Sequence, residues 1–174
     1  MHFQIELPNS NDEVIKFNDS NITLDENGIF DIGGLDIDGY WHEENRKKFG
    51  GKKLIFTNCT GLKKIEADAL GLRGIEIIDC EKLERISASN NRLEELDLSI
   101  SNSKELVYLN VSANNLKTLK IKNCDNLETL KCQNNKLKKL DLSDNNKLED
   151  LDCSFNEIER FFLQWLLFDR FELQ

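Results

Sequence analysis

The residues of this sequence best suited to covalent or metal chemistry are five cysteines and two histidines. His2 and His42 lie 40 positions apart, and neither belongs to a recognisable nucleophile or metal motif. A zinc site needs ligands at short fixed spacings, such as a Cys-x-x-Cys pair, and no such pair is present. The spacing of these residues therefore predicts no metal and no cofactor.

Other catalytic motifs are also incomplete. Asp36-Ile37-Asp38-Gly39 resembles part of a calcium loop, but its glycine comes too early and the closing acid is missing. His42-Glu43-Glu44 lacks the second histidine of a zinc-protease helix. There is neither a glycine-rich phosphate loop nor a Gly-x-Ser-x-Gly turn. We expect no catalytic residues and no enzymatic activity.

The cysteines instead follow an internal repeat. One leucine series is spaced by 21, 23, 21 and 21 residues, and a second series follows it ten residues later. The first series is Leu62, Leu83, Leu106, Leu127 and Leu148, and the second is Leu72, Leu93, Leu116, Leu137 and Ile158. Each unit reads Leu-x-x-Leu-x-Leu-x-x-Asn-x-Leu. The asparagine place holds Asn91, Asn114, Asn135 and Asn156, with Leu70 in the first copy.

The repeat predicts its own secondary structure. The x-Leu-x-Leu-x run has period two, which is typical of a strand with one buried face. Equivalent strands one unit apart can stack only in parallel, one per turn of a coil. We expect strands near residues 64 to 67, 85 to 88, 108 to 111, 129 to 132 and 150 to 153. The second half of each unit also has period two, which favours extended structure there.

This pattern resembles the leucine-rich repeat family, and its nested double form looks like the short bacterial class of about 21 residues, sometimes called IRREKO. The resemblance covers residues 51 to 166. It implies a β-rich solenoid with a parallel sheet on the concave side and an extended convex side.

The ends of such a stack must be covered. We expect one domain, with an N-terminal β-rich cap at residues 1–50, repeats at 51–160 and a short C-terminal cap at 161–174. In the N-terminal cap, residues 3–7 and 14–17 alternate like strands, and 40–49 suit a short helix. The Asn27-Gly28 pair favours a hairpin between residues 22–24 and 29–30. An alternative for the apolar C-terminal segment is contact with another chain.

The charge and hydropathy of the chain argue against two classes of partner, nucleic acids and membranes. The chain has 174 residues and a net charge of −9, of which residues 1–50 contribute −7. An acidic chain repels phosphate backbones, so we expect no nucleic-acid partner. No apolar run could cross a bilayer and no signal peptide is visible, so we expect no membrane partner and a cytoplasmic location.

Two sets of repeat positions point inward. The asparagines are expected to form a structural ladder that satisfies backbone groups of their own and the neighbouring turn. The five cysteines also take inward places, where a thiol acts as a small apolar side chain. Their odd number favours reduced thiols, although Cys132 and Cys153 are close enough along the stack that a bridge between them stays open.

The outward positions form the candidate binding surface. We expect a non-catalytic protein-interaction module that binds an unidentified protein, with Arg85 and Tyr108 as anchors. The predicted concave-face residues are Lys64, Glu66, Arg85, Ser87, Tyr108, Asn110, Lys131, Asp152 and Phe155. Two alternatives remain: a structural or self-assembling homo-oligomer, and an intracellular effector-like protein that binds host factors. A convex basic cluster comprises Lys117, Lys120, Lys122, Lys138 and Lys139.

Overall fold

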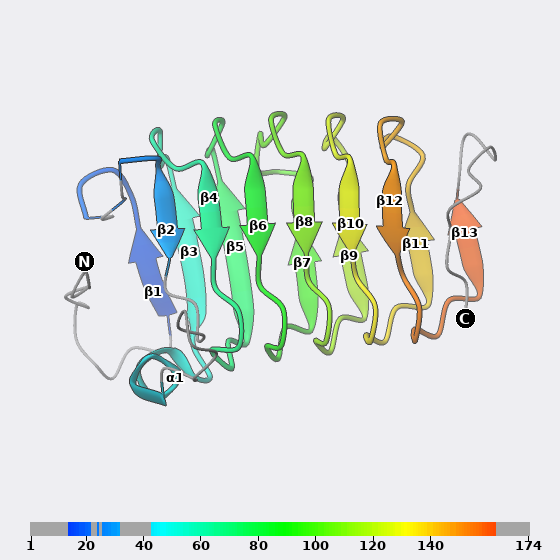
Figure 1. Cartoon of the computed structure of the whole chain (residues 1–174), viewed down its shortest axis with the longest axis horizontal. Coiled ribbons are helices and arrows are strands. Elements are labelled where there is room, and N and C mark those ends of the chain that lie inside the picture. Colours follow the sequence, from blue (N-terminus) through cyan, green and yellow to red (C-terminus); the bar gives the residue numbers. More distant parts are fainter. Residues whose placement is uncertain (1–13, 22–23, 25, 32–42, 163–174) are drawn as a thin grey trace.

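The computed structural model describes residues 14–21, 24, 26–31 and 43–162. Within these ranges the chain winds into a flattened coil with two facing layers of strands (Figure 1). Each turn of the coil contributes one strand to each layer. One layer is a six-stranded sheet. It contains β2 (Ile29–Asp31), β4 (Lys64–Glu66), β6 (Arg85–Ser87), β8 (Tyr108–Asn110), β10 (Thr129–Lys131) and β12 (Asp150–Asp152).

The opposite layer is called the segmented sheet here, because its strands pair in three groups. The groups are β1 (Val14–Phe17), β3 (Lys53–Thr57) and β5 (Gly74–Ile78); β7 (Glu95–Asp97) and β9 (Thr118–Lys120); and β11 (Lys139–Asp141) and β13 (Arg160–Phe162). Helix α1 (Glu43–Phe49) lies at the N-terminal end of the coil (Figure 1).

All strand pairs are parallel and in phase with the repeat. Leu130 lies beside Leu109 on one side and Leu151 on the other, so equivalent residues form continuous columns. The expected strands of the repeat are confirmed, each ending one residue earlier than predicted. The second half of each unit is extended as well, as its period predicts.

The core lies between the two layers. Alternate residues of each strand point inward, and the column Ile65, Ile86, Leu109, Leu130 and Leu151 is buried throughout. At the N-terminal end an aromatic cluster fills the coil, with ring centroids 4.7 Å apart for Phe17–Phe30 and 5.1 Å apart for Phe17–Phe56 and Phe30–Phe56. Each buried aromatic side chain removes a large apolar area from water, which stabilises this end.

The N-terminal strands continue the two sheets. β1 pairs with β3 and β2 pairs with β4, so residues 14–31 supply one further place in each layer. The first strand of the expected hairpin, residues 22–24, lies largely outside the described part, and among the described residues β2 pairs in parallel with β4. Gly28 has a φ of 75° and its carbonyl accepts from the Lys63 amide at 2.8 Å. The Asn-Gly turn therefore directs the chain beside β4, and residues 22, 23 and 25 lie outside the described part.

Several other predictions also fall outside the described residues. These are the strand at 3–7, the start of the helix at 40–42, the calcium-like Asp36–Gly39 segment, and the C-terminal cap beyond residue 162. Among the residues that are described, no helix is long and apolar enough to span a membrane.

Candidate functional site

The outer face of the six-stranded sheet presents the predicted binding residues. Alternation along each strand turns Lys64, Arg85, Tyr108, Thr129 and Asp150 outward in one row, and Glu66, Ser87, Asn110, Lys131 and Asp152 in the next. Phe155 lies in the turn after β12, with 64% of its surface exposed. The fold thus places eight of the nine predicted residues on the strands of one sheet and Phe155 in the turn that follows its last described strand.

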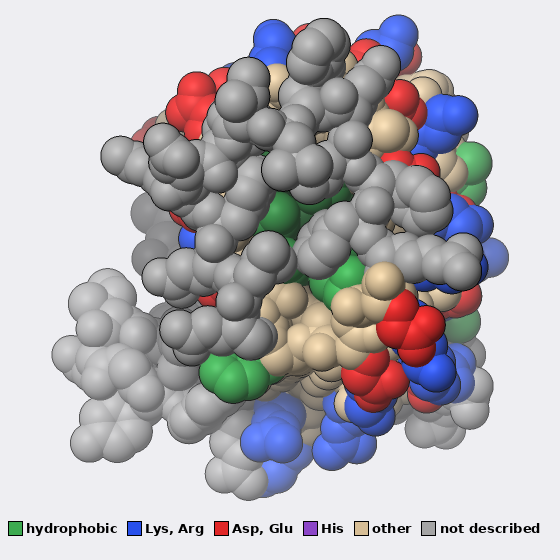
Figure 2. Space-filling view, turned by 90° about the vertical axis from the view of Figure 1, so that its right-hand side faces the viewer, with side chains coloured by type: hydrophobic (Ala, Val, Ile, Leu, Met, Phe, Trp, Pro, Cys, Tyr) green, Lys and Arg blue, Asp and Glu red, His purple; other side chains and the backbone are tan. Residues whose placement is uncertain are grey.

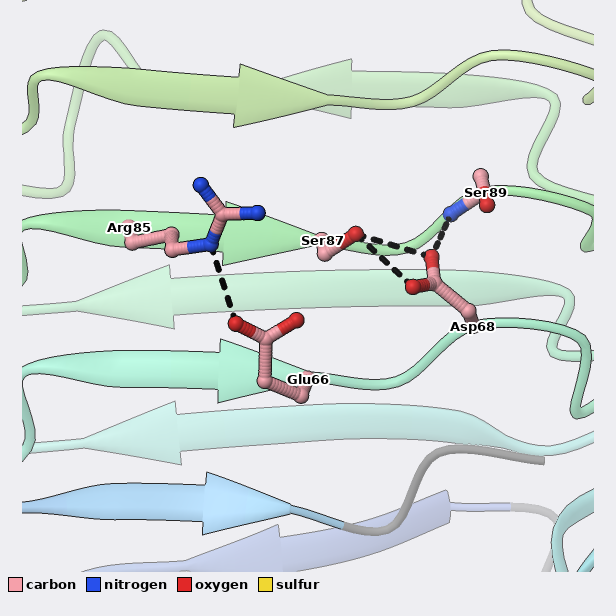
Figure 3. Close-up of polar contacts among 5 residues, drawn as sticks. All are labelled: Glu66, Asp68, Arg85, Ser87 and Ser89. Carbon is pink, nitrogen blue, oxygen red and sulfur yellow. Dashed lines mark hydrogen bonds and ion pairs between the residues drawn. The ribbon is translucent and has the colours of Figure 1, made fainter. Parts of the chain in front are cut away.

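Arg85 is held between two neighbours on this face. Its Nε donates to Glu66 Oε1 at 3.0 Å, and its guanidinium lies 3.4 Å from the centre of the Tyr108 ring. The ion pair, drawn in Figure 3, and the cation–π contact restrain a side chain that is only half-buried. The predicted anchors therefore form one rigid group with Glu66, instead of two independent side chains.

Asp68 organises the adjoining row, although it was not one of the nine predicted binding residues. Its carboxylate accepts from the Ser87 hydroxyl at 3.0 and 2.8 Å and from the Ser89 amide (Figure 3). Ser87 is only 3% exposed, so its hydroxyl bonds Asp68 within the sheet. The spacing in the sequence could have predicted this contact. The pairs Asp68–Ser87, Glu66–Arg85 and Lys131–Asp150 are each 19 residues apart. Nineteen residues are one repeat minus two positions, which places the two side chains diagonally across neighbouring strands.

Asn110 and Asp152 act on their own strand ends. Asn110 Oδ1 accepts from the amide of Ser112 at 3.1 Å and from its hydroxyl at 2.8 Å. Asp152 Oδ1 makes the same pair of bonds to Ser154, at 3.1 and 2.7 Å. The Asp/Asn-x-Ser motif therefore closes the end of a strand in an Asx-type turn.

Charged side chains of both signs occur at each end of the six-stranded sheet, with Glu66 and Asp68 beside Lys64, and Lys131 beside Asp150. Lys63 and Lys64 lie near its N-terminal end. At the C-terminal end Glu149 and Asp150 are exposed, and Asp150 Oδ1 accepts from Lys131 Nζ at 2.7 Å. This end therefore combines negative charge with the exposed ring of Phe155.

The asparagine ladder lies in the turns that follow this sheet. Asn135 Nδ2 donates to the carbonyls of Val111 and Cys132 at 2.9 and 3.0 Å, and its Oδ1 accepts from the Leu116 amide at 2.9 Å. Asn91, Asn114 and Asn156 make equivalent bonds between neighbouring coils. Each amide therefore bonds backbone groups that would otherwise be buried without partners.

All five cysteines are buried and free of disulfide bonds. Burial raises the pKa of Cys124 to about 12 and that of Cys153 to about 11, and it raises the pKa of Cys132 further. The thiols of Cys59 and Cys80 donate to the carbonyls of Thr57 and Ile78, and the interaction between these neighbouring thiols raises the pKa of Cys59 and lowers that of Cys80. The remaining thiols stay protonated near neutral pH because a buried thiolate would be poorly solvated.

The convex basic cluster lies on the segmented sheet and is partly neutralised. Lys117 Nζ contacts Glu94 Oε2 at 2.8 Å and Lys120 Nζ contacts Asp97 Oδ2 at 2.7 Å. The Lys117 ammonium lowers the pKa of the exposed Glu94 carboxyl. Lys122, Lys138 and Lys139 are exposed. Solvent screening leaves such exposed pairs with little effect on stability.

No group of three or more potential metal ligands converges anywhere in the described ranges. Comparisons with protein-family models, curated proteins and solved structures found no match for this chain. The chain is a parallel β-solenoid. It has about five turns spaced by about 21 residues and almost no helix in the described part. This solenoid displays one ordered polar face and one face of paired charges.

Proposed function

We propose that this solenoid is a non-catalytic protein-interaction module of the leucine-rich repeat type, whose binding surface is the outer face of the six-stranded sheet. The Glu66–Arg85–Tyr108 group is the main observation behind the proposal. Tyr and Arg are the residue types that most often dominate binding energy at protein interfaces. Here both lie half-exposed near the centre of the sheet and already contact each other.

Pre-ordering supports this choice of face. Immobilising a long flexible side chain during binding costs about 0.5–1.5 kcal/mol. Arg85 is already restrained by Glu66 and Tyr108, and Lys131 by Asp150. A partner would therefore meet side chains that have lost part of their freedom in the free protein, and less of the binding energy would be spent on ordering them.

The assignment to leucine-rich repeats also stays a proposal. The register of the Leu and Asn columns and the extended second half support the short class of about 21 residues. A partner protein, a cytoplasmic location and the lack of nucleic-acid or membrane partners complete the proposal, and they rest on composition and repeat pattern alone.

Binding can be tested with two matched double variants. A partner is first isolated by affinity pull-down from the native cell, and its affinity is measured by titration calorimetry. Tyr108→Ala with Arg85→Ala should weaken binding by about 2 kcal/mol or more. Lys120→Ala with Lys139→Ala, on the segmented sheet, should leave it nearly unchanged.

Thermal unfolding of both double variants provides the control. Removing Tyr108 and Arg85 deletes one half-buried ion pair and one cation–π contact and leaves the apolar core untouched, so the fold should persist. If the lysine pair weakens binding and the Tyr108–Arg85 pair does not, the binding face has been assigned to the wrong sheet.

A further inference from the structure

The guanidinium of Arg85 is held on two sides and exposed on a third. Its Nε edge is occupied, because Nε donates to Glu66 Oε1 at 3.0 Å. One of its faces is occupied as well, since the central carbon lies 3.4 Å from the centre of the Tyr108 ring. Figure 3 shows the two terminal nitrogens of Arg85 directed away from the Glu66 carboxylate. The edge between these two nitrogens is therefore the part that a ligand can meet.

Solvent reaches this edge although Arg85 lies in an inner strand. The side chain is 34% exposed, and β6 is flanked by β4 on one side and by β8 on the other. Its two neighbours in the same outward row are Lys64 and Tyr108. Within the described part of the chain, the terminal nitrogens of Arg85 donate to no acceptor. Their N–H groups are thus available to an acceptor from outside.

The outward row that contains Arg85 is made of hydrogen-bond donors. From β4 to β10 its neighbouring side chains are Lys64, Arg85, Tyr108 and Thr129. Two of these side chains are cations and the other two carry hydroxyl groups. In the view from the C-terminal end of the coil, by contrast, Lys and Arg side chains lie next to Asp and Glu side chains along the margin of the molecule (Figure 2). The row therefore favours an anionic group on a ligand.

The shape and surroundings of Arg85 select among anions. A guanidinium presents parallel N–H groups that match the two oxygens of a planar carboxylate, so such a pair forms two hydrogen bonds at once. A phosphate monoester also fits this geometry, but it carries close to a second negative charge at neutral pH. Glu66 and Asp68 lie on the adjoining positions of the neighbouring coil and would repel the extra charge. A carboxylate is the better match.

We propose that Arg85 receives the carboxylate of an Asp or Glu side chain on an exposed segment of a partner protein. The two terminal nitrogens would each donate to one carboxylate oxygen, while Glu66 and the Tyr108 ring keep the guanidinium in place. Lys64 would add a second positive charge beside the bound carboxylate. This inference rests on the proposed protein-binding function and adds the chemistry of the group that is bound.

Three blocked peptides that differ at one residue serve as probes: Gly-Ser-Glu-Ser-Gly, the same peptide with Gln, and the same peptide with phosphoserine at the central position. NMR titration of the full chain follows the Arg85 Nε–H signal and the Tyr108 amide. The Glu peptide should bind at least about tenfold more tightly than the Gln peptide, because a charge-assisted pair is replaced by a neutral one. It should also bind more tightly than the phosphoserine peptide.

Two variants carry the same change at different arginines. Arg85→Lys alters the proposed site, whereas Arg92→Lys alters an exposed arginine in the turn after the six-stranded sheet. Lysine keeps the positive charge but lacks the planar pair of donors. Arg85→Lys should reduce the preference for Glu over Gln to about threefold or less, and Arg92→Lys should leave it unchanged. Thermal unfolding shows that both variants are folded, and a purely structural role of Arg85 would not alter this preference.

Three outcomes would overturn the proposal: equal affinity for the Glu and Gln peptides, an unchanged preference in Arg85→Lys, or tighter binding of the phosphoserine peptide. The test is separable from that of the proposed function. Loss of partner binding in the Tyr108–Arg85 variant without any preference for the Glu peptide would keep the sheet face and reject the carboxylate. An Arg85-dependent Glu preference, with partner binding retained in that double variant, would keep the carboxylate site and reject this face as the partner's binding surface.

Discussion

Each coil contains two turns, one after each sheet, and the two turns satisfy their buried backbone groups in different ways. The turn after the six-stranded sheet holds a buried asparagine, which bonds backbone groups of two neighbouring coils. The turn after the segmented sheet holds Cys59, Cys80, Ser101, Cys124 or Asn145 at its inward position. Its backbone closes on itself through bonds such as Leu83 N to Cys80 O and Leu127 N to Cys124 O, both at 3.1 Å.

The difference shows that turn geometry selects the residue type. A turn that leaves amides and carbonyls facing the core requires a side chain with both a donor and an acceptor, and asparagine has both. A self-closing turn leaves only a small apolar space, which a thiol fills. Asn145 stands in the second kind of turn, where its Nδ2 donates to the Ile121 and Cys124 carbonyls of the preceding coil. Its buried Oδ1 has no hydrogen-bond partner in the described part of the chain. The two kinds of turn should therefore differ in how much stability they lose on the same substitution.

The largest expected effect is at the asparagine ladder. Asn135→Ala should lower the free energy of unfolding by about 1–3 kcal/mol, because the Leu116 amide and the Val111 carbonyl lose their partner. Chemical denaturation measures the change. Asn146→Ala, at an exposed position just outside the pattern, serves as control and should cost under about 0.5 kcal/mol. Equal costs would contradict the assigned register.

Exchanging the two side chains sharpens the comparison. Asn135→Cys should cost about 2 kcal/mol, since a thiol cannot replace the amide's bonds. Asn145→Cys should change stability by under about 1 kcal/mol, because it loses two donated bonds but also removes an unsatisfied buried oxygen. If Asn145→Cys lowered the free energy of unfolding more than Asn135→Cys, the description of the second turn as self-closing would be wrong.

The thiol columns predict a loss of stability at alkaline pH. In the folded chain burial raises the pKa of Cys124 to about 12 and of Cys153 to about 11, whereas an unfolded thiol titrates near about 8.5. Above that value the unfolded state binds fewer protons, so stability decreases as pH rises toward 11. Each thiol should contribute a loss of roughly 1 kcal/mol per pH unit in this window.

The double variant Cys124→Ala with Cys153→Ala isolates this effect. Denaturation at pH 8 and pH 10 should show a shallower decline in the variant than in the parent. Thiol titration of the parent at neutral pH should detect few reactive groups under native conditions and all five after unfolding. Rapid native labelling of several thiols would contradict their buried placement.

The smallest effect concerns the residue with positive φ in each turn. The second turn mostly uses Asn or Asp there, whereas the first turn holds Phe155 at a φ of 52° where Asn134 has 56° one coil earlier. A bulky side chain is strained in this region, and asparagine is tolerated. Phe155→Asn should therefore stabilise the fold by about 0.5–1 kcal/mol in thermal unfolding. A destabilised variant would mean that the ring makes contacts that outweigh the strain.

Prediction from sequence succeeded where the determining interaction is local or repeated. The period-two alternation placed β4, β6, β8, β10 and β12 to within one residue, because each strand meets a copy of itself in the next coil. The Asn27-Gly28 pair did not predict the parallel pairing of β2, since a tight turn is equally compatible with a hairpin and with a chain that enters a parallel sheet. The tertiary structure pairs β2 with β4.

The candidate site was only partly predictable. The repeat predicted which side chains point outward. Which of these side chains bond each other depends on the residues at the adjacent positions of the neighbouring coils. Asp68 became important because Ser87 lies diagonally across from it, and Arg85 found Glu66 on one side and Tyr108 on the other. These contacts join residues about 20 positions apart that differ from copy to copy, so the repeat consensus does not encode them.

The sequence by itself determined the architecture of this protein, because identical short strands at a fixed spacing can bury their apolar faces only by stacking in parallel. It also determined which positions face the core. Only the tertiary structure decided which polar groups hold one another and which stay open, since that depends on the neighbour that each coil receives. Val111 and Cys132 find an acceptor in the following coil, whereas Cys153 meets none in the described chain. Among the described strands, β12 is the last of the six-stranded sheet.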